Sequence, residues 1–229
     1  MTTSSPRPHL DRVLLSCGFA PALFAAVLLI ESFTRAGYDP WAHFGSELAN
    51  GERGWTVIAA FICAGALTIA FAVGLRRSLA RGRGAVAAPI LFGLFGIGLV
   101  VAGAFVVDPK PGYPAGSTGA VSTLAGTIHD ANLLPTWLVM TAAMAATARR
   151  LAAEPGGRPW AVYTIAAAVI SIGALMTALA VFDSATQTGA WHGLWQRIAI
   201  TIGFTWFGAI ALQRLRSKRS KVDDRAQAA

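Results

Sequence analysis

The chain alternates long apolar stretches with shorter polar or Gly/Pro-rich breaks. A helix needs roughly 20 mainly apolar residues to cross the ~30 Å hydrocarbon core of a bilayer. Six stretches reach that length: Val13–Phe33, Trp55–Leu75, Ala85–Val107, Ile128–Ala148, Trp160–Phe182 and Gly193–Leu212. Lipid cannot hydrogen-bond to an exposed backbone, and the chain lacks the alternating pattern of a membrane β-barrel. The pattern therefore predicts an all-α, polytopic membrane protein with six transmembrane helices.

Composition supports lipid as the solvent of this chain. Hydrophobic residues make up 55% of the 229 residues, and charged residues make up only 13%. Because so few charges cannot cover a soluble globule of this size, we exclude a soluble enzyme. No folded basic domain with stacking aromatic residues is present, so we expect no nucleic-acid partner despite the net charge of +8.

The positions of the basic residues predict the orientation in the cell membrane. With the N-terminus inside, inner segments hold 15 of the 19 Lys and Arg residues, which gives +11 inside and −3 outside. Basic residues collect in cytoplasmic loops, so we expect both termini to be cytoplasmic. The domain boundaries follow: a cytoplasmic segment 1–12, a single membrane domain 13–212 with outer loops 34–54, 108–127 and 183–192, and a basic, disordered cytoplasmic tail 213–229.

Small residues cluster on two of the predicted spans. They are Gly93, Gly96, Gly98 and Gly103 on the third span, and Ala167, Ser171, Ala174 and Ala178 on the fifth. Such residues let helix backbones approach closely in a bilayer. They predict close packing within the bundle, but they serve dimer contacts equally well, so the oligomeric state stays open.

The outer side of this topology concentrates histidine and acidic residues. Three of the four histidines lie there, each preceded by an aspartate in its connection: Asp39 and His43, Asp108 and His129, Asp183 and His192. Asp108 and Asp183 end outward-running helices, where the helix dipole disfavours a carboxylate. Turn hydrogen bonds, water, a histidine, Arg197 or a bound cation should compensate these two charges. We expect a polar site at the outer mouth of the bundle.

The first outer loop, Ala36–Trp55, is more than a linker. Ser46-Glu47-Leu48 falls on a short amphipathic segment that fits an interfacial or re-entrant helix. If that segment is helical, His43 lies on the same face as Ser46 and would serve as the base for a serine nucleophile. Ser and Glu near a helix start are also cap chemistry, which we favour.

Some of these residues carry a family resemblance. The motifs are Gly37-Tyr38-Asp39-Pro40, Ser46-Glu47-Leu48, Gly54-Trp55, Asp108-Pro109 and Ile128-His129. Together they resemble the uncharacterised six-helix bacterial and archaeal membrane family catalogued as domain of unknown function 998, over roughly Val13–Leu212. The resemblance implies a six-helix fold and no established activity. It also implies a polar extracytoplasmic site of Asp39, Ser46, Glu47, Asp108 and His129, whereas His43 and His192 rest on the charge argument alone.

Three classes of function are consistent with these observations. The first is a non-catalytic membrane protein that binds a lipid, small molecule or partner at its outer face, because no complete catalytic or phosphate-binding motif is present. The second is a membrane-embedded hydrolase or lipid-modifying transferase that uses acid/base chemistry or a divalent metal such as zinc, held by Asp108, His129 and His192.

The third class is a transporter, which the near absence of charge at mid-depth in the spans disfavours. Haem binding is less favoured still, because the outer histidines lie at helix ends and not inside the bundle. Whether the protein is an enzyme therefore stays open.

Overall fold

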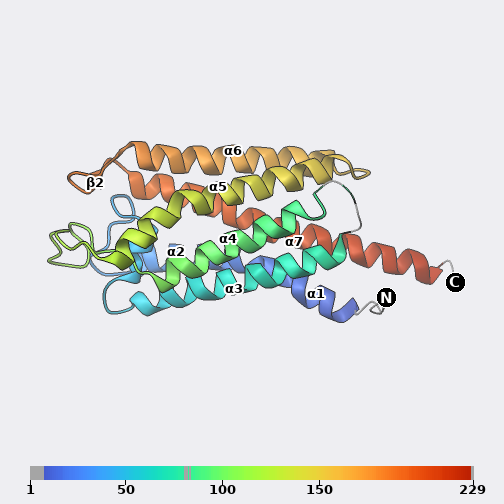
Figure 1. The fold of residues 1–229 in the computed structure, drawn as a ribbon, viewed down its shortest axis with the longest axis horizontal. Coiled ribbons are helices and arrows are strands. Elements are labelled where there is room, and N and C mark those ends of the chain that lie inside the picture. Colours follow the sequence, from blue (N-terminus) through green and yellow to red (C-terminus); the bar gives the residue numbers. More distant parts are fainter. Residues whose placement is uncertain (1–7, 80–81, 83, 228–229) are drawn as a thin grey trace.

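The computed structural model describes residues 8–79, 82 and 84–227, and its helices run along one long axis (Figure 1). The α-helices are α1 (Pro8–Ser16), α2 (Ala20–Thr34), α3 (Gly54–Ser78), α4 (Ala87–Ala104), α5 (Leu124–Ala152), α6 (Arg158–Ala180) and α7 (His192–Gln227). Two short 3-10 helices, η1 (Cys17–Phe19) and η2 (Gly45–Ala49), and the two-residue strands β1 (Phe182–Asp183) and β2 (Thr188–Gly189) complete the fold. The strands pair antiparallel, with Phe182 opposite Gly189.

The six predicted spans are confirmed. Helical segments long and apolar enough to cross a membrane are His9–Thr34, Gly54–Ser78, Ala87–Ala104, Leu124–Ala152, Arg158–Ala180 and His192–Ser217. The boundaries differ from the apolar runs where capping extends a helix. For example, α5 begins at Leu124 because the Thr123 hydroxyl accepts a hydrogen bond from the Gly126 amide, at 3.0 Å.

The spans form a closed ring in which each helix packs against its neighbours in sequence, and α7 packs back against α2. Aromatic side chains from α4 and α7 meet inside this ring. The ring centroids of Phe92 and Trp206 are 5.9 Å apart, and those of Phe95 and Phe207 are 5.0 Å apart. Such contacts hold helices together where lipid supplies no hydrophobic driving force between them.

Small residues bring the helices close, as the sequence predicts. A Cβ at Gly96 of α4 would lie 2.7 Å from the carbonyl oxygen of Gly65 in α3, and one at Gly65 would lie 2.5 Å from that of Gly96. Gly98 and Gly103 meet neighbouring helices in the same way, whereas a Cβ at Gly93 would meet nothing within 4 Å. The small residues predicted on the fifth span are all buried in α6.

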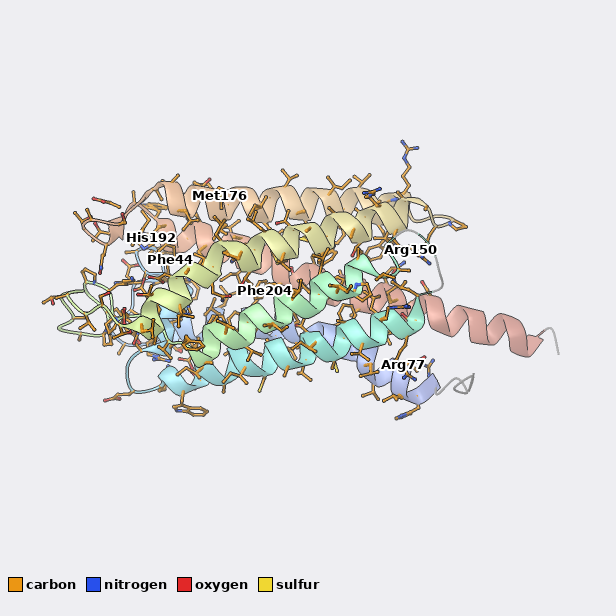
Figure 2. All side chains as sticks on the ribbon, viewed as in Figure 1. Phe44, Arg77, Arg150, Met176, His192 and Phe204 are labelled. Atoms are coloured by element: carbon orange, nitrogen blue, oxygen red, sulfur yellow. The ribbon has the colours of Figure 1, made fainter. Side chains whose placement is uncertain are left out.

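The bundle has two unlike ends. Residues 35–53, 105–123 and 181–191 form the loop end, and the end that carries Arg77, Arg150 and Arg214 is the basic end. Figure 2 shows Phe44 and His192 at the loop end, with Arg77 and Arg150 at the opposite end. At the basic end α7 continues to Gln227, and the disorder expected for the tail 213–229 stays a prediction. Residues 213–227 contain no Gly or Pro and are rich in good helix formers.

Candidate functional site

The loop end is closed by the first loop, residues 35–53, and Arg35 anchors this loop to α2. The Arg35 Nη2 atom lies 2.6 Å from Glu31 Oε2, and Arg53 Nη2 lies 3.2 Å from the same oxygen. Arg35 Nη1 also donates to the Tyr113 hydroxyl at 3.0 Å. Further donations go to the carbonyl oxygens of Leu48, Asn50 and Arg53. The side chain of Arg35 is only 7% exposed, so this set of acceptors is what makes its burial tolerable.

Arg197, near the start of α7, anchors the other side of the first loop. Its Nε and Nη2 atoms donate to the Ser32 hydroxyl at 3.2 and 3.0 Å. Its Nη1 donates to the carbonyl oxygens of His43 and Gly193, both at 2.9 Å, and its Nη2 also donates to the Tyr38 hydroxyl. Burial raises the pKa of Tyr38 well above its ordinary value, so Tyr38 stays a neutral acceptor for the guanidinium. Arg197 thereby joins α2, the first loop and α7.

Glu47 is a buried carboxyl within η2, and the residue is 1% exposed. Its Oε1 atom accepts the Phe44 backbone N–H at 2.9 Å. Its Oε2 atom has no hydrogen-bond partner among the described residues. Burial raises the pKa of Glu47 to about 7, against the opposing effects of the Phe44 N–H and of the charges on Lys110 and Arg197. Near neutral pH both the protonated and the ionised form of Glu47 are therefore populated.

A cavity of about 50 Å³ lies beneath the first loop, and we call it the loop-end cavity. Most of its wall is apolar and aromatic, and Phe204, near the middle of the bundle in Figure 2, marks its depth. Five polar side chains line it: Ser46, His129, Asn132, Thr136 and Gln196. A water molecule needs about 10–15 Å³ on this measure, so the cavity admits a group of a few heavy atoms. An apolar pocket with a few converging polar groups is the usual form of a ligand site.

His129 of α5 offers this cavity a hydrogen-bond acceptor. Its Nδ1 atom lies 3.0 Å from the carbonyl oxygen of Ala102 and 2.8 Å from that of Phe105, at the end of α4. Carbonyl oxygens only accept, so Nδ1 must carry a proton, and in the neutral ring Nε2 then holds the lone pair. Among residues 8–79, 82 and 84–227, Nε2 has no hydrogen-bond partner. His129 thus satisfies the end of α4 with one nitrogen and leaves the other available.

The other polar groups of the cavity are partly used within the protein. Asn132 Nδ2 donates to the Gly98 carbonyl oxygen at 2.9 Å, and Thr136 Oγ1 donates to Asn132 Oδ1 at 3.0 Å. Gln196 Oε1 accepts the Gly45 backbone N–H at 2.6 Å. The Ser46 hydroxyl makes no hydrogen bond within the described part of the chain. Ser46, His129 and Gln196, whose Nε2 makes no hydrogen bond within the described residues, therefore have hydrogen-bonding capacity to spare.

The expected pairing of Ser46 with His43 is not observed. The His43 Nε2 atom lies 3.3 Å from the carbonyl oxygen of Pro111, and its Nδ1 atom lies 3.3 Å from the Asp39 amide nitrogen. Phe44 is extended and precedes η2, so no helix connects His43 to Ser46 and the expected spacing on one helix face does not arise. The ring of His43 supports the first loop, and Ser46 shares its cavity with His129 instead.

Two of the three candidate aspartates, Asp39 and Asp183, serve turns, and Asp108 binds the N-cap residue of α5. Asp39 Oδ1 accepts the Trp41 N–H at 2.8 Å. Asp108 accepts the Thr123 hydroxyl at 2.6 Å and the Thr123 N–H at 2.9 Å. Asp183 accepts the Ala185 N–H and the Thr186 hydroxyl, both at 2.9 Å. These bonds, with the Ala185 N–H first, lower the pKa of Asp183. Local turn hydrogen bonds thus compensate Asp183, the Thr123 N–H and hydroxyl at the N-cap of α5 compensate Asp108, and Arg197 binds elsewhere.

His192 packs into the protein and does not line the loop-end cavity. It is 1% exposed, its Nδ1 lies 3.0 Å from the Gly189 carbonyl oxygen, and its ring centroid lies 4.6 Å from that of Phe44. Within the described residues, no group of three or more His, Cys, Asp and Glu side chains is placed to hold a metal ion. The metal hypothesis for Asp108, His129 and His192 therefore stays a prediction from sequence.

The structure uses residues that the sequence pattern does not single out. Arg35 and Tyr113 meet across 78 positions of chain, so no local signal could pair them. Gln196 and Arg197 were detectable, because an amide and a guanidinium stand next to each other at the start of an apolar run. In a membrane span, such polar groups are retained only where they find partners inside the protein.

The fold defines a multi-pass membrane protein with six apolar helices and a closed loop end. Residues 19–213 match the family described as protein of unknown function DUF998, and the chain belongs to that family. The resemblance noted from the sequence motifs is thereby confirmed. No curated protein and no solved structure matches the chain.

Proposed function

We propose that this chain is a multi-pass protein of the cell membrane whose loop end faces out of the cell and binds a small molecule, or one end of a lipid, in the loop-end cavity. The orientation rests on the basic residues, 15 of 19 of which belong to the inner segments. The binding role rests on one observation: His129, locked through Nδ1 to the end of α4, lines an apolar cavity with an unused Nε2.

The cavity selects the chemistry of its ligand. Nε2 with a lone pair accepts a hydrogen bond, so the ligand group that enters should carry a hydroxyl or amide donor. The aromatic wall from α2, α3, α4 and α7 favours an apolar body next to that donor. The volume of about 50 Å³ limits the inserted part to a few heavy atoms. A neutral headgroup or a small neutral amphiphile meets all three conditions.

The binding proposal is tested with His129→Asn. The asparagine amide nitrogen retains a donor near the position of Nδ1, but the Nε2 acceptor is removed. Full-length protein purified in mild detergent is analysed by native mass spectrometry, and its bound molecules are extracted and identified. Wild type should carry a bound molecule that His129→Asn lacks. The control is Thr141→Ala, on the same helix but outside the cavity, which should retain the molecule.

The orientation proposal is tested separately by cysteine labelling. In a background with Cys17 and Cys63 replaced by alanine, one cysteine is placed at Ala115 on an exposed part of the loop end or at Ser217 near the basic end. A membrane-impermeant maleimide added to intact cells should label A115C and not S217C. The opposite result would reverse the topology without touching the cavity argument.

One observation favours a second candidate function, an acid/base hydrolase or transferase. Ser46, with no hydrogen bond in the described residues, lines the same cavity as the His129 acceptor. A serine hydroxyl and an imidazole acceptor in one cavity are the two groups that a nucleophile and its base require. A fluorophosphonate probe should then label wild type at Ser46, and labelling should be lost in both Ser46→Ala and His129→Asn. Absence of labelling in wild type leaves the binding role as the proposal.

A further inference from the structure

A second and larger cavity lies at the basic end, and we call it the basic-end cavity. Its volume is about 720 Å³. The end of α5, the turn at 153–157 and the first turn of α6 form one side of it, and α7 and the end of α3 form the other. Figure 2 places Arg150, which lines this cavity, at the end of the bundle opposite His192. The basic-end cavity is therefore independent of the loop-end cavity.

The charge on the wall of this cavity is positive. Arg150, Arg214 and Arg216 line it, together with one acidic residue, Glu154. Glu154 Oε1 accepts from Arg150 Nε at 2.8 Å, and both of its oxygens lie 2.9 Å from Arg214 Nη1. Among the described residues that line the cavity, one carboxylate stands against three guanidinium groups, so their formal charges leave an excess of two positive charges. Such an excess in a concave wall attracts an anion.

Two buried polar atoms of the wall lack partners. The Arg214 side chain is only 10% exposed, yet its Nε has no hydrogen-bond acceptor among the described residues. The Oε1 atom of Gln213, the preceding residue, is also buried and has no hydrogen-bond partner among the described residues. Native proteins pair nearly all buried polar atoms, so an unpaired donor and an unpaired acceptor on residues that line one cavity indicate that a bound group supplies partners there.

The start of α6 adds a third feature to the same wall. The N-cap residue, Gly157, lines the cavity and provides no side-chain cap. Pro159 has no N–H, but the backbone N–H groups of Arg158 and Trp160 lack partners within the helix and lie at the positive end of its dipole, where a phosphate is favoured. Trp160, in the first turn of α6, supplies an aromatic wall typical of the lipid headgroup region.

We propose that the basic-end cavity binds a phosphate group, held by Arg214 and Arg216 at the start of α6. Guanidinium groups match phosphate oxygens in geometry and charge, and Gln213 is placed to bind a hydroxyl next to the phosphate. The phosphate belongs either to an anionic lipid headgroup or to a free phosphate ion. Leu79, Pro155 and Trp160 give the cavity an apolar rim at the end of the spans, which suits a lipid whose chains continue into the bilayer.

The test is a titration of the detergent-solubilised full chain at fixed ionic strength, followed by the midpoint of thermal unfolding. One arm adds dioleoylphosphatidylglycerol in mixed micelles, a second adds inorganic phosphate, and dioleoylglycerol, which lacks phosphate, is the control ligand. Wild type should be stabilised by a phosphate-bearing ligand and not by dioleoylglycerol. Stabilisation in the first arm identifies a lipid headgroup, and stabilisation in the second alone identifies free phosphate.

Three substitutions assign the effect to the cavity. Arg214→Gln should weaken the apparent affinity about tenfold or more, the value expected for one charge-assisted hydrogen bond. Arg216 is exposed, so Arg216→Gln should fold normally, and it should also weaken binding, which keeps the test decisive if Arg214→Gln is unstable. The matched control is Arg149→Gln, an exposed arginine at the same end that does not line the cavity. Equal weakening in Arg149→Gln, or no stabilisation by either phosphate ligand, overturns the proposal.

Discussion

Arg197 and Arg214 lie on the same helix, α7, and both are almost fully buried, yet their surroundings differ. Arg197 at the loop end donates to four acceptors on α2, the first loop and α7. Arg214 at the basic end shares Glu154 with Arg150, leaves its Nε unpaired and lines a cavity of about 720 Å³. Arg197 thus acts as a structural clamp between these elements, whereas Arg214 keeps an unpaired hydrogen-bond donor beside a cavity.

The contrast teaches how to separate structure from function in a protein of this kind. A buried charge whose partners all come from the chain is explained by folding alone. Unpaired polar atoms beside a cavity are not explained in that way, and each end has such atoms: His129 Nε2 at the loop end and Arg214 Nε at the basic end. Sites are therefore best sought where hydrogen bonding is incomplete, and not where charges are densest.

The largest expected effect breaks the clamp at the loop end. Arg197→Met removes five donations to four acceptors and leaves the hydroxyls of Ser32 and Tyr38 and two carbonyl oxygens with fewer partners. We expect a loss of about 3–5 kcal/mol in the free energy of unfolding, the usual result of breaking a buried charge network. Unfolding of the detergent-solubilised variant by denaturant measures this loss.

Arg214→Met is the matched comparison for the clamp. Glu154 keeps its bond to Arg150 and its side chain is 25% exposed, so we expect a loss of only about 1 kcal/mol. An equal loss in the two variants would show that both arginines are structural. The distinction between the two ends would then be wrong.

The next prediction concerns the pH dependence of the free energy of unfolding that Glu47 contributes. Its pKa is about 7 in the folded protein against 4.5 ordinarily, so the folded state binds the proton more tightly. Stability should therefore fall as pH rises from 4.5 to about 7 and change no further above that, by at most about 3 kcal/mol. Glu47→Gln keeps an acceptor for the Phe44 N–H and removes the ionisation. This variant should be the more stable protein at pH 8, and a wild-type unfolding profile with the same slope as the variant would contradict the assignment.

The architecture could be predicted from the sequence, whereas the site could be predicted only in part. Long apolar runs specify spanning helices because lipid leaves the backbone no other choice, and all six spans follow from them. Ser46 and His129 were predicted at one end of the bundle and do share a cavity. Their shared cavity could not be foreseen, because it depends on how η2 of the first loop packs against α2, α3 and α7. Asp108 and Asp183 were ambiguous in sequence, since a turn and a ligand site use the same residue type.

The smallest expected effect concerns Glu154. Its contribution to stability depends on pH in the opposite direction to that of Glu47. Burial raises the pKa of Glu154, but the hydrogen bonds and charges of Arg150 and Arg214 outweigh it, so the pKa lies below its ordinary value. The ion pairs therefore stabilise the fold above about pH 4.5, and this contribution is lost as pH falls through the folded pKa. The pairs are partly exposed, so Glu154→Gln should cost only about 1 kcal/mol at pH 7 and less at pH 3. Unfolding curves at the two pH values provide the measurement. An equal loss of unfolding free energy at pH 3 and pH 7 would contradict the stabilising role of the ionised Glu154.

The central claim is that the loop-end cavity binds a ligand through His129, and an experimental structure of the purified full chain tests it most directly. We expect density that does not belong to the protein in the cavity, with an atom within about 3 Å of His129 Nε2. The same density should be absent from His129→Asn, while Nδ1 in wild type keeps its bonds to the Ala102 and Phe105 carbonyl oxygens. A wild-type cavity filled by the protein's own side chains, with His129 Nε2 bonded to one of them, would contradict the claim.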